Sequence, residues 1–260
     1  MFREFHHQTR GRGHIEDGTP CQDRTAYLNR AGIQVLCLAD GAGSAAKSEL
    51  GAQALVSEGS RLLADSFRTI ITREDGALVK VELVQRLLSC VEQVAKRKGL
   101  GVRDLAATFL AVAVSDDQFI AVHVGDGVIA YVKNGELKLI SGPDNEEFAN
   151  QTTFLTSESA ATTMRLLRGA LDGVTGFLMM SDGPASTLFD YRSKTLAPAC
   201  RKIVDLMSTA STFSAPSYRR QIRRLLETKI SDSTKDDCSL AIFGRVATAS
   251  EVGGVNPQQA

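Results

Sequence analysis

The order of its apolar segments is the feature of this chain that most limits its fold. Short strand-like runs at residues 25–28 and 33–38 are followed by two long segments, 45–70 and 78–98, whose apolar side chains repeat at helical spacing. Further strand-like runs come next, then helical segments and a last apolar run at 240–246. Strands and helices therefore do not alternate as in a doubly wound sheet, and the order predicts an α+β fold with antiparallel sheets covered by outer helices.

Two turns between strand-like runs are specified by their residues. Asn134-Gly135 separates two such runs and is typical of a type I′ hairpin. The first two runs pair around Ala31, so the start of the first strand faces the end of the second. This pairing places Asp23 beside Asp40.

Composition and charge exclude several classes of protein. The chain has 260 residues, of which 43% are hydrophobic and 23% charged, as is usual for globular proteins. Thirty basic and thirty acidic residues give no net charge, so no general basic surface attracts nucleic acid or an anionic membrane. No apolar run is long enough to span a bilayer, and the polar first twelve residues lack the apolar centre of a signal peptide. Five widely spaced cysteines without a C-x-x-C pair favour a reducing, cytoplasmic location.

The chain shows no internal repeat and no obvious linker, so residues 1–246 are expected to form one domain. Residues 141–163 are polar and irregular, with scattered aromatic side chains, and are expected to form a flap beside the functional site. The Gly-, Pro- and Gln-containing tail 247–260 is expected to be disordered.

Aspartates stand where several apolar runs begin or end. Asp40, Asp126 and Asp182 each follow such a run, whereas Asp23 and Asp236 precede one. Because a strand that ends in an acid can lie beside an antiparallel strand that begins with one, these aspartates can meet at one edge of the sheets. Asp-Gly is also a common turn sequence, so each aspartate taken alone is better explained as a turn former than as a ligand, and it is their shared position at strand ends that weakens this explanation.

Clustered carboxylates repel one another strongly where the dielectric constant is low. Such a cluster persists when cations offset its charge, and oxygen ligands without His or Cys suit Mg²⁺ or Mn²⁺. Two such ions about 4 Å apart lower the pKa of a bridging water and hold a phosphate group.

Six short motifs occur in a fixed order along the chain. They are Cys21-Gln22-Asp23, Asp40-Gly41-Ala42-Gly43-Ser44, Ala106-Ala107-Thr108, Val124-Gly125-Asp126-Gly127, Ser181-Asp182-Gly183 and Asp236-Asp237-Cys238-Ser239. In this order they resemble the type 2C metal-dependent protein serine/threonine phosphatases, and most of all their divergent bacterial branch. The resemblance covers residues 10 to 245.

The resemblance implies a four-layer αββα sandwich, in which two antiparallel sheets are flanked by pairs of helices. It also implies hydrolysis of phosphoserine and phosphothreonine in proteins by in-line attack of a water or hydroxide that bridges two Mn²⁺ or Mg²⁺ ions, without a phosphoenzyme intermediate. Phosphorylated proteins, and a serine/threonine kinase that phosphorylates them, are the implied partners.

The same resemblance assigns roles to individual residues. Asp40 matches the carboxylate that bridges the two metals, and the Gly41 carbonyl matches a ligand of one of them. Asp182 and Asp236 match the remaining direct ligands. Asp23 matches an acid that holds a metal-bound water, which implies both a catalytic and a metal-binding role.

The position of the family pattern that binds the substrate phosphate is changed in this chain. Many members carry an Arg five residues before the first Asp to bind phosphate, and that position is Gly18 here. Arg12, Arg24 or His14 can take over this role, and the sequence does not choose among them. His14 is also a candidate for the proton donor to the leaving group.

The other changes concern the leaving group and a third ion. Some members have a His after the Asp-Gly turn, and Ala42 stands there; a metal-bound water can serve instead of His14. Ser186 occupies the place of one third-site acid, whereas Asp126 matches the other. The missing Arg and His motivate one alternative, a catalytically weak regulatory binding protein. A hydrolase of small phosphate esters is the second alternative, because the sequence does not separate such substrates from phosphorylated proteins. His123 lies inside an apolar run and is expected to be a core residue.

Overall fold

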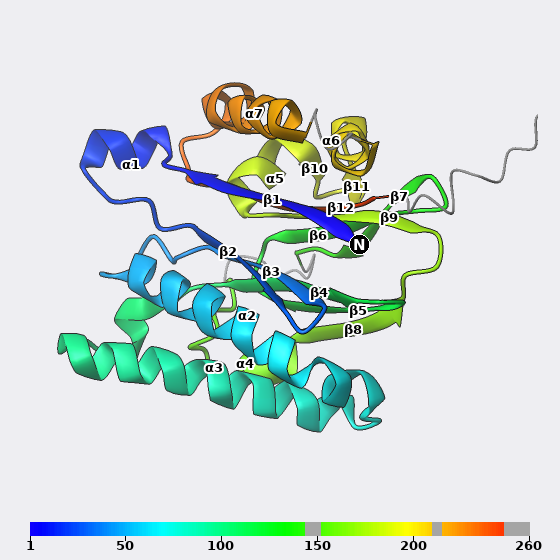
Figure 1. The fold of residues 1–260 in the computed structure, drawn as a ribbon. Coiled ribbons are helices and arrows are strands. Elements are labelled where there is room, and N and C mark those ends of the chain that lie inside the picture. Colours follow the sequence, from blue (N-terminus) through cyan, green and yellow to red (C-terminus); the bar gives the residue numbers. More distant parts are fainter. Residues whose placement is uncertain (144–151, 210–214, 247–260) are drawn as a thin grey trace, which may run out of the picture.

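Two antiparallel β-sheets pack face to face, and helices cover both outer faces (Figure 1). The computed structural model describes residues 1–143, 152–209 and 215–246. The predicted α+β arrangement of two antiparallel sheets with flanking helices is confirmed. Within the described residues, no helix is both long and apolar enough to span a bilayer.

Each sheet has five strands. The first sheet has the order β1-β12-β9-β6-β7 and contains Phe2–Thr9 (β1), Cys238–Arg245 (β12), Val174–Met180 (β9), Val128–Lys133 (β6) and Glu136–Ser141 (β7). The second has the order β2-β3-β4-β5-β8 and contains Arg24–Arg30 (β2), Ile33–Ala39 (β3), Phe109–Ser115 (β4), Gln118–Val124 (β5) and Arg165–Ala170 (β8).

Helices pack on the outside of both sheets. The second sheet is covered by Ser48–Thr72 (α2) and Gly76–Lys98 (α3), and the first by Asp182–Leu188 (α5), Pro198–Thr209 (α6) and Ala215–Leu225 (α7). The shorter elements are Arg12–Asp17 (α1), Val102–Leu105 (η1), Ala160–Thr163 (α4), Phe189–Asp190 (β10), Thr195–Leu196 (β11), Leu226–Ile230 (η2) and Ser231–Ser233 (η3).

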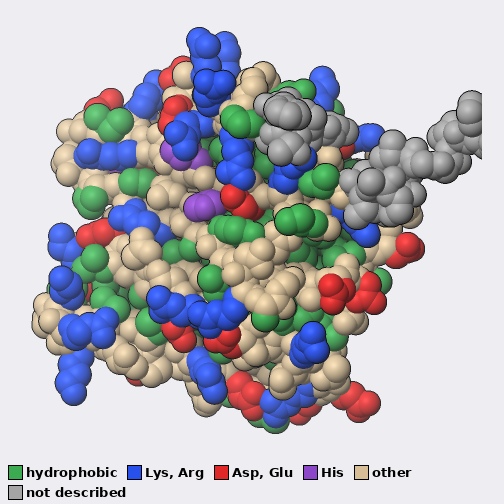
Figure 2. Space-filling view, in the orientation of Figure 1, with side chains coloured by type: hydrophobic (Ala, Val, Ile, Leu, Met, Phe, Trp, Pro, Cys, Tyr) green, Lys and Arg blue, Asp and Glu red, His purple; other side chains and the backbone are tan. Residues whose placement is uncertain are grey.

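Aromatic and aliphatic side chains fill the space between the sheets. Phe119 on β5 and Phe177 on β9 come from opposite sheets, and their ring centroids are 5.1 Å apart. Leu110 on β4 and Phe243 on β12 are also fully buried in this layer. Burying such side chains contributes about 2 kcal/mol each, so this layer fixes how the two sheets lie on each other. Charged side chains of both signs are interspersed over the visible surface (Figure 2), as the zero formal net charge leads one to expect.

The two predicted hairpins form as expected. Asn134 and Gly135 have φ angles of 52° and 75°, the left-handed conformation that a type I′ turn requires. β2 pairs with β3 from Arg30↔Ile33 to Arg24↔Ala39. The next positions outward in this register are Asp23 and Asp40, so the prediction that these two lie side by side is confirmed.

Several elements of the structure were not expected from the sequence. β1 is an edge strand in which only Phe2 and Phe5 are buried, so it lacks the alternation that identifies a strand. α1 and α5 are too short for helical periodicity to show. The expected strand from residue 105 begins later, because residues 102–105 form a turn of 3₁₀ helix. The tail and residues 144–151 of the expected flap lie outside the described residues.

His123 on β5 is a buried core residue, as its apolar surroundings predict. Its Nδ1 lies 2.7 Å from the hydroxyl oxygen of Ser141 at the end of β7, so the pair links the two sheets. Burial lowers the pKa of His123 to about 3, and the positive charge of Arg165 adds to this effect. The imidazole is therefore neutral in the folded protein at physiological pH.

The buried imidazole makes stability depend on pH. In the unfolded chain His123 takes up a proton below its ordinary pKa of 6.5, whereas in the folded protein it does so only near pH 3. Folded protein is therefore destabilised as the pH falls below 6.5, by up to about 1.4 kcal/mol per pH unit. Between pH 7 and pH 5, urea titration should show the wild type losing roughly 1–2 kcal/mol more free energy of unfolding than His123→Asn. An equal loss in both proteins would contradict this assignment.

Candidate active site

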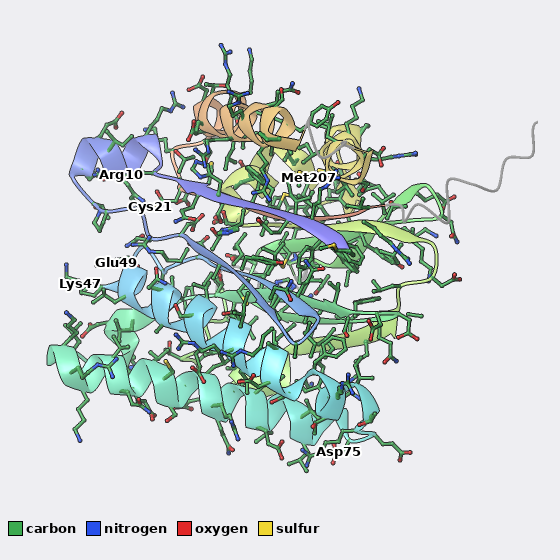
Figure 3. All side chains as sticks on the ribbon, viewed as in Figure 1. Arg10, Cys21, Lys47, Glu49, Asp75 and Met207 are labelled. Carbon is green, nitrogen blue, oxygen red and sulfur yellow. The ribbon has the colours of Figure 1, made fainter. Side chains whose placement is uncertain are left out.

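The aspartates identified in the sequence lie at one end of the sandwich. β3, β5 and β9 end there, and β2, α5 and β12 begin there. Figure 3 shows Cys21 and Glu49 at this end, whereas Asp75 lies at the opposite end of the α2–α3 pair. The sheet packing therefore brings strand ends from both sheets to the same place.

Asp40 is fixed by its backbone to the neighbouring strand. Thr108 donates its N–H to the Asp40 carbonyl at 2.8 Å, and the hydroxyl oxygen of Thr108 accepts the Asp40 N–H at 2.9 Å. A Cβ atom on Gly41 would lie 2.7 Å from Ser48, so α2 can begin this close to the turn only because residue 41 is glycine. Among the described residues nothing donates a hydrogen bond to the Gly41 carbonyl. Thr108 is structural, and the Asp40 carboxyl and the Gly41 carbonyl are left for other partners.

Asp23 is completely buried beside Asp40. Ser181, the residue before α5, donates its hydroxyl to Asp23 Oδ2 at 2.8 Å, whereas among the described residues no group lies at hydrogen-bond geometry to Asp23 Oδ1. Burial raises the pKa of Asp23 to about 8, and the negative charge of Asp237 adds to it. This carboxylate is costly to ionise unless a cation lies near it.

Asp40 and Asp182 form a closely coupled pair of carboxyl groups. Burial raises the pKa of Asp40 well above its usual range, and the charges of Asp23 and Asp182 raise it further. Burial also raises the pKa of Asp182 to about 6, and Asp236 and Asp126 add to that shift. The five carboxylates therefore act on one another, and they form the acidic cluster (Asp23, Asp40, Asp126, Asp182 and Asp236).

The outer members of the acidic cluster are more accessible. Asp236 is exposed, and its Oδ1 accepts the N–H of Asp237 at 2.8 Å. Asp126 is half-buried, and its Oδ2 accepts the hydroxyl of Thr152 at 2.5 Å. Thr152 belongs to the segment expected to form a flap, so the described part of that segment does reach the cluster.

Asp237 is a structural residue of the site that the sequence reasoning did not single out. It is buried, and its Oδ1 and Oδ2 accept the backbone N–H groups of Gly11 and Gln22, both at 2.6 Å. Nδ1 of His14 lies 3.0 Å from Asp237 Oδ1, an ion-pair distance without the angles of a hydrogen bond. Asp237 thus ties the ends of β1 and of the loop before β2 to the start of β12. The sequence does not distinguish Asp237 from its acidic neighbour Asp236, because only the fold shows which of the two side chains points inward.

The other candidates for handling phosphate are placed differently. Arg12 donates to the carbonyl of Asp232 at 2.8 Å, and Arg24 donates to the carbonyls of Cys21 and Asp23 at 2.6 and 2.7 Å. Both guanidinium groups therefore have backbone partners. His14 is one-fifth exposed beside Asp237, and within the described residues its Nε2 has no hydrogen-bond partner. The two guanidinium groups are turned to backbone carbonyls, whereas His14 is held beside the buried carboxylate of Asp237.

The acidic cluster fits hard divalent cations. Asp23 Oδ1 and Asp182 Oδ1 are buried without hydrogen-bond partners, and both groups resist ionisation in the absence of positive charge. In the described part of the chain, no three His, Cys, Asp or Glu side chains converge tightly enough to hold an ion by themselves. Mg²⁺ and similar ions usually keep several waters and accept carbonyl ligands, so the Gly41 carbonyl and water can complete such a site.

The sequence and the fold of this chain were both compared with those of known proteins. The model of the family described as Protein phosphatase 2C matches residues 10–227. Serine/threonine-protein phosphatase 3 of Escherichia coli (strain K12) is 27% identical over 258 residues, covering 93% of this chain and 97% of the relative.

Solved structures of bacterial phosphatases share the fold. The serine/threonine phosphatase Stp1 of Staphylococcus aureus superposes with a TM-score of 0.64 at 13% identity, covering 94% of this chain and 95% of that one. The catalytic domain of the serine/threonine protein phosphatase PstP, solved in complex with two manganese ions, superposes with a TM-score of 0.62 at 18% identity, covering 95% and 99%. The resemblance is confirmed: the chain belongs to the protein phosphatase 2C family of metal-dependent serine/threonine protein phosphatases.

Proposed function

We propose that residues 1–246 form a catalytic domain that hydrolyses phosphoserine and phosphothreonine in proteins. The observation that carries the proposal is the acidic cluster, whose buried carboxylates have raised pKa values and unpartnered oxygen atoms. Such groups are stable together when divalent cations lie between them. A serine/threonine kinase that phosphorylates the same proteins is the expected opposing enzyme.

Within this proposal, four groups hold two Mn²⁺ or Mg²⁺ ions directly: the carboxylates of Asp40, Asp182 and Asp236, and the Gly41 carbonyl. Asp40 would be the ligand shared by the ions, as the family resemblance implies, and it lies close enough to Asp23 and Asp182 for their charges to raise its pKa. When bound, the ions supply an acidified water and neutralise the charge on the phosphate. Asp126 stands on the Thr152 side of the cluster and is the candidate for a further ion.

Two residues orient the reacting water and the phosphate. Asp23 is held rigidly through Oδ2 by Ser181, so its free Oδ1 can accept a hydrogen bond from water in the cluster. His14 keeps its ring in place through the contact between Nδ1 and Asp237, which leaves Nε2 for the phosphate or the leaving oxygen. This gives His14 the role for which the sequence made it a candidate.

Loss of the shared ligand should abolish turnover. With Mn²⁺ and a phosphothreonine peptide, Asp40→Asn and Asp182→Asn should each lower kcat about 100-fold or more, because each removes an anionic ligand. Asp65→Asn, an exposed acid on α2, is the matched control and should keep full activity. Equal turnover by all four proteins would reject the assignment. Retained Mn²⁺ binding without turnover of any phosphopeptide would instead favour a regulatory binding protein.

The metal-free cluster should destabilise the fold. In EDTA at pH 8, Asp40→Asn should raise the free energy of unfolding by roughly 1–2 kcal/mol, because it removes one of several repelling carboxylates. Added Mn²⁺ should stabilise the wild type more than the variant, since the wild type binds the ion more tightly. Urea titration with and without Mn²⁺ measures both effects. A variant that is less stable in EDTA and gains as much from Mn²⁺ would contradict the electrostatic account.

Asp237 should act by positioning the cluster. Asp237→Ala frees two backbone N–H groups, so we expect Mn²⁺ affinity and kcat/KM to fall about tenfold each. Asp237→Asn keeps an acceptor for one of the two N–H groups, and its loss should be smaller. Calorimetry with Mn²⁺ alone separates positioning from effects on substrate. Unchanged Mn²⁺ affinity in Asp237→Ala would show that the anchor does not shape the metal site.

A further inference from the structure

β8 is an edge strand whose outer side is open. It ends the sheet order β2-β3-β4-β5-β8 and pairs only with β5. Over the described part of the chain, no backbone hydrogen bond from another segment reaches this outer side between Arg165 and Ala170. The strand therefore offers a row of backbone donors and acceptors to an incoming chain.

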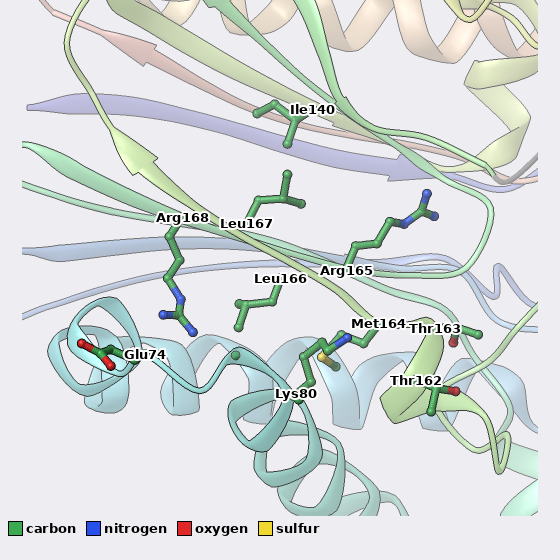
Figure 4. Close-up of a pocket in the computed structure, with 12 residues that line it drawn as sticks. Glu74, Lys80, Ile140, Thr162, Thr163, Met164, Arg165, Leu166, Leu167 and Arg168 are labelled. Carbon is green, nitrogen blue, oxygen red and sulfur yellow. The ribbon is translucent and has the colours of Figure 1, made fainter.

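A groove of about 680 Å³ follows this open side. Its upper wall includes Ile140 of β7, and its lower wall is the start of α3 (Figure 4). Leu167 points from β8 toward Ile140, whereas Leu166 and Arg168 point toward the helices. Successive side chains of a strand added beside β8 would therefore contact the upper and the lower wall in turn, because side chains along a strand point alternately to its two faces.

The lower half of the groove attracts negative charge. Lys80 and Arg168 line it together with a single acid, Glu74, and Arg165 lines its near end. A Cβ atom on Gly76 would lie 3.7 Å from Arg168 Nη2, so this guanidinium lies over the first residue of α3. The N-terminus of that helix is already capped by Asp75, whose Oδ1 accepts the Leu78 N–H at 2.9 Å, so the positive charge at this place comes from Lys80 and Arg168.

The groove starts at the end of the molecule that holds the acidic cluster. Arg165, the first residue of β8, pairs with His123, which lies three residues before Asp126. From there β8 runs antiparallel to β5, away from the cluster and toward the α2–α3 turn near Asp75. Its six residues span about 20 Å. A chain lying along β8 is therefore directed toward the cluster at one end.

We propose that β8 and this groove bind an extended acidic segment that flanks the phosphorylated residue of a protein substrate. The segment adds to the sheet as a sixth strand beside β8, and an acidic side chain lies between Lys80 and Arg168. This inference rests on the proposed function for the phosphate end of the substrate. Backbone pairing supplies affinity, and the basic side chains select acidic sequences.

Other occupants fit the groove less well. In an antiparallel pairing of β8 with a second copy of itself, centred between Leu166 and Leu167, each Arg165 faces an Arg168, and like charges directly opposite are destabilising. The last fourteen residues of this chain, 247–260, include one acidic side chain, Glu251. An acidic partner strand brings more negative charge to Lys80 and Arg168 than either alternative does.

Direct binding tests the groove without any catalytic step. The probe is a fluorescent, unphosphorylated eight-residue peptide with alternating Glu and Val, compared with its Gln and Val counterpart by anisotropy. Lys80→Glu should weaken binding of the acidic peptide about fivefold or more, whereas Arg86→Glu, the same charge change on α3 outside the groove, should change it less than about twofold. Equal effects of the two variants, or equal affinity for the two peptides, would overturn the proposal.

Kinetics and backbone methylation test the placement. A phosphothreonine peptide with the acidic flank should have a KM about fivefold lower than one with the neutral flank, at similar kcat, and Lys80→Glu should remove the difference. N-methylation of alternate flank residues should raise KM if the flank pairs with β8. An acidic preference that methylation leaves intact at every position would refute strand addition, as would a β8-dependent dimer in sedimentation. Hydrolysis of para-nitrophenyl phosphate, unchanged in Lys80→Glu, separates failure of the groove from failure of the phosphatase activity.

Discussion

Packing of the two sheets against each other is the constraint on which the rest of this structure depends. Phe119 and Phe177 meet between the sheets and, with the aliphatic side chains around them, fix one sheet relative to the other. That relation decides which strand ends are neighbours. β3 brings Asp40 from one sheet, and the junction of β9 and α5 brings Asp182 from the other. Catalytic geometry at this end is therefore a consequence of hydrophobic packing some distance away.

The cluster opposes the packing that creates it. Burial and mutual repulsion raise the pKa values of Asp23, Asp40 and Asp182, so ionising them works against folding. Hydrogen bonds with Thr108 and Ser181 fix the cluster, but within the described residues Asp23 Oδ1 and Asp182 Oδ1 have no hydrogen-bond partner. The cluster therefore lowers the stability of the protein where its carboxylate oxygens repel one another. Such a loss of stability is usual for a site that binds cations.

The sequence predicted the parts of the fold that depend on local pattern. The Asn134-Gly135 turn and the pairing of Asp23 with Asp40 followed from turn chemistry and strand register, and the long helices followed from their periodicity. β1 could not be predicted, because an edge strand that buries Phe2 and Phe5 without alternation has no periodic signal. The role of Asp237 could not be separated from that of Asp236, because the direction of a side chain at a strand start is set by tertiary packing. Residues 144–151 of the expected flap lie outside the described residues, so the flap remains a prediction.

An open sandwich differs from a closed barrel because its edge strands can pair with other chains. A barrel has no edges, whereas here β7 and β8 end their sheets on the same side, with Ile140 and Leu167 facing each other across the groove. Charges such as Arg165 and Arg168 on an edge strand discourage self-association and at the same time favour an acidic strand. The chemistry is confined to the strand ends, so changes along this side can alter which chains are bound without altering the metal ligands. In the two proposals made above, selection of protein substrates and hydrolysis of the phosphate depend on different surfaces of the sandwich: the open edge at β8, and the strand ends of both sheets.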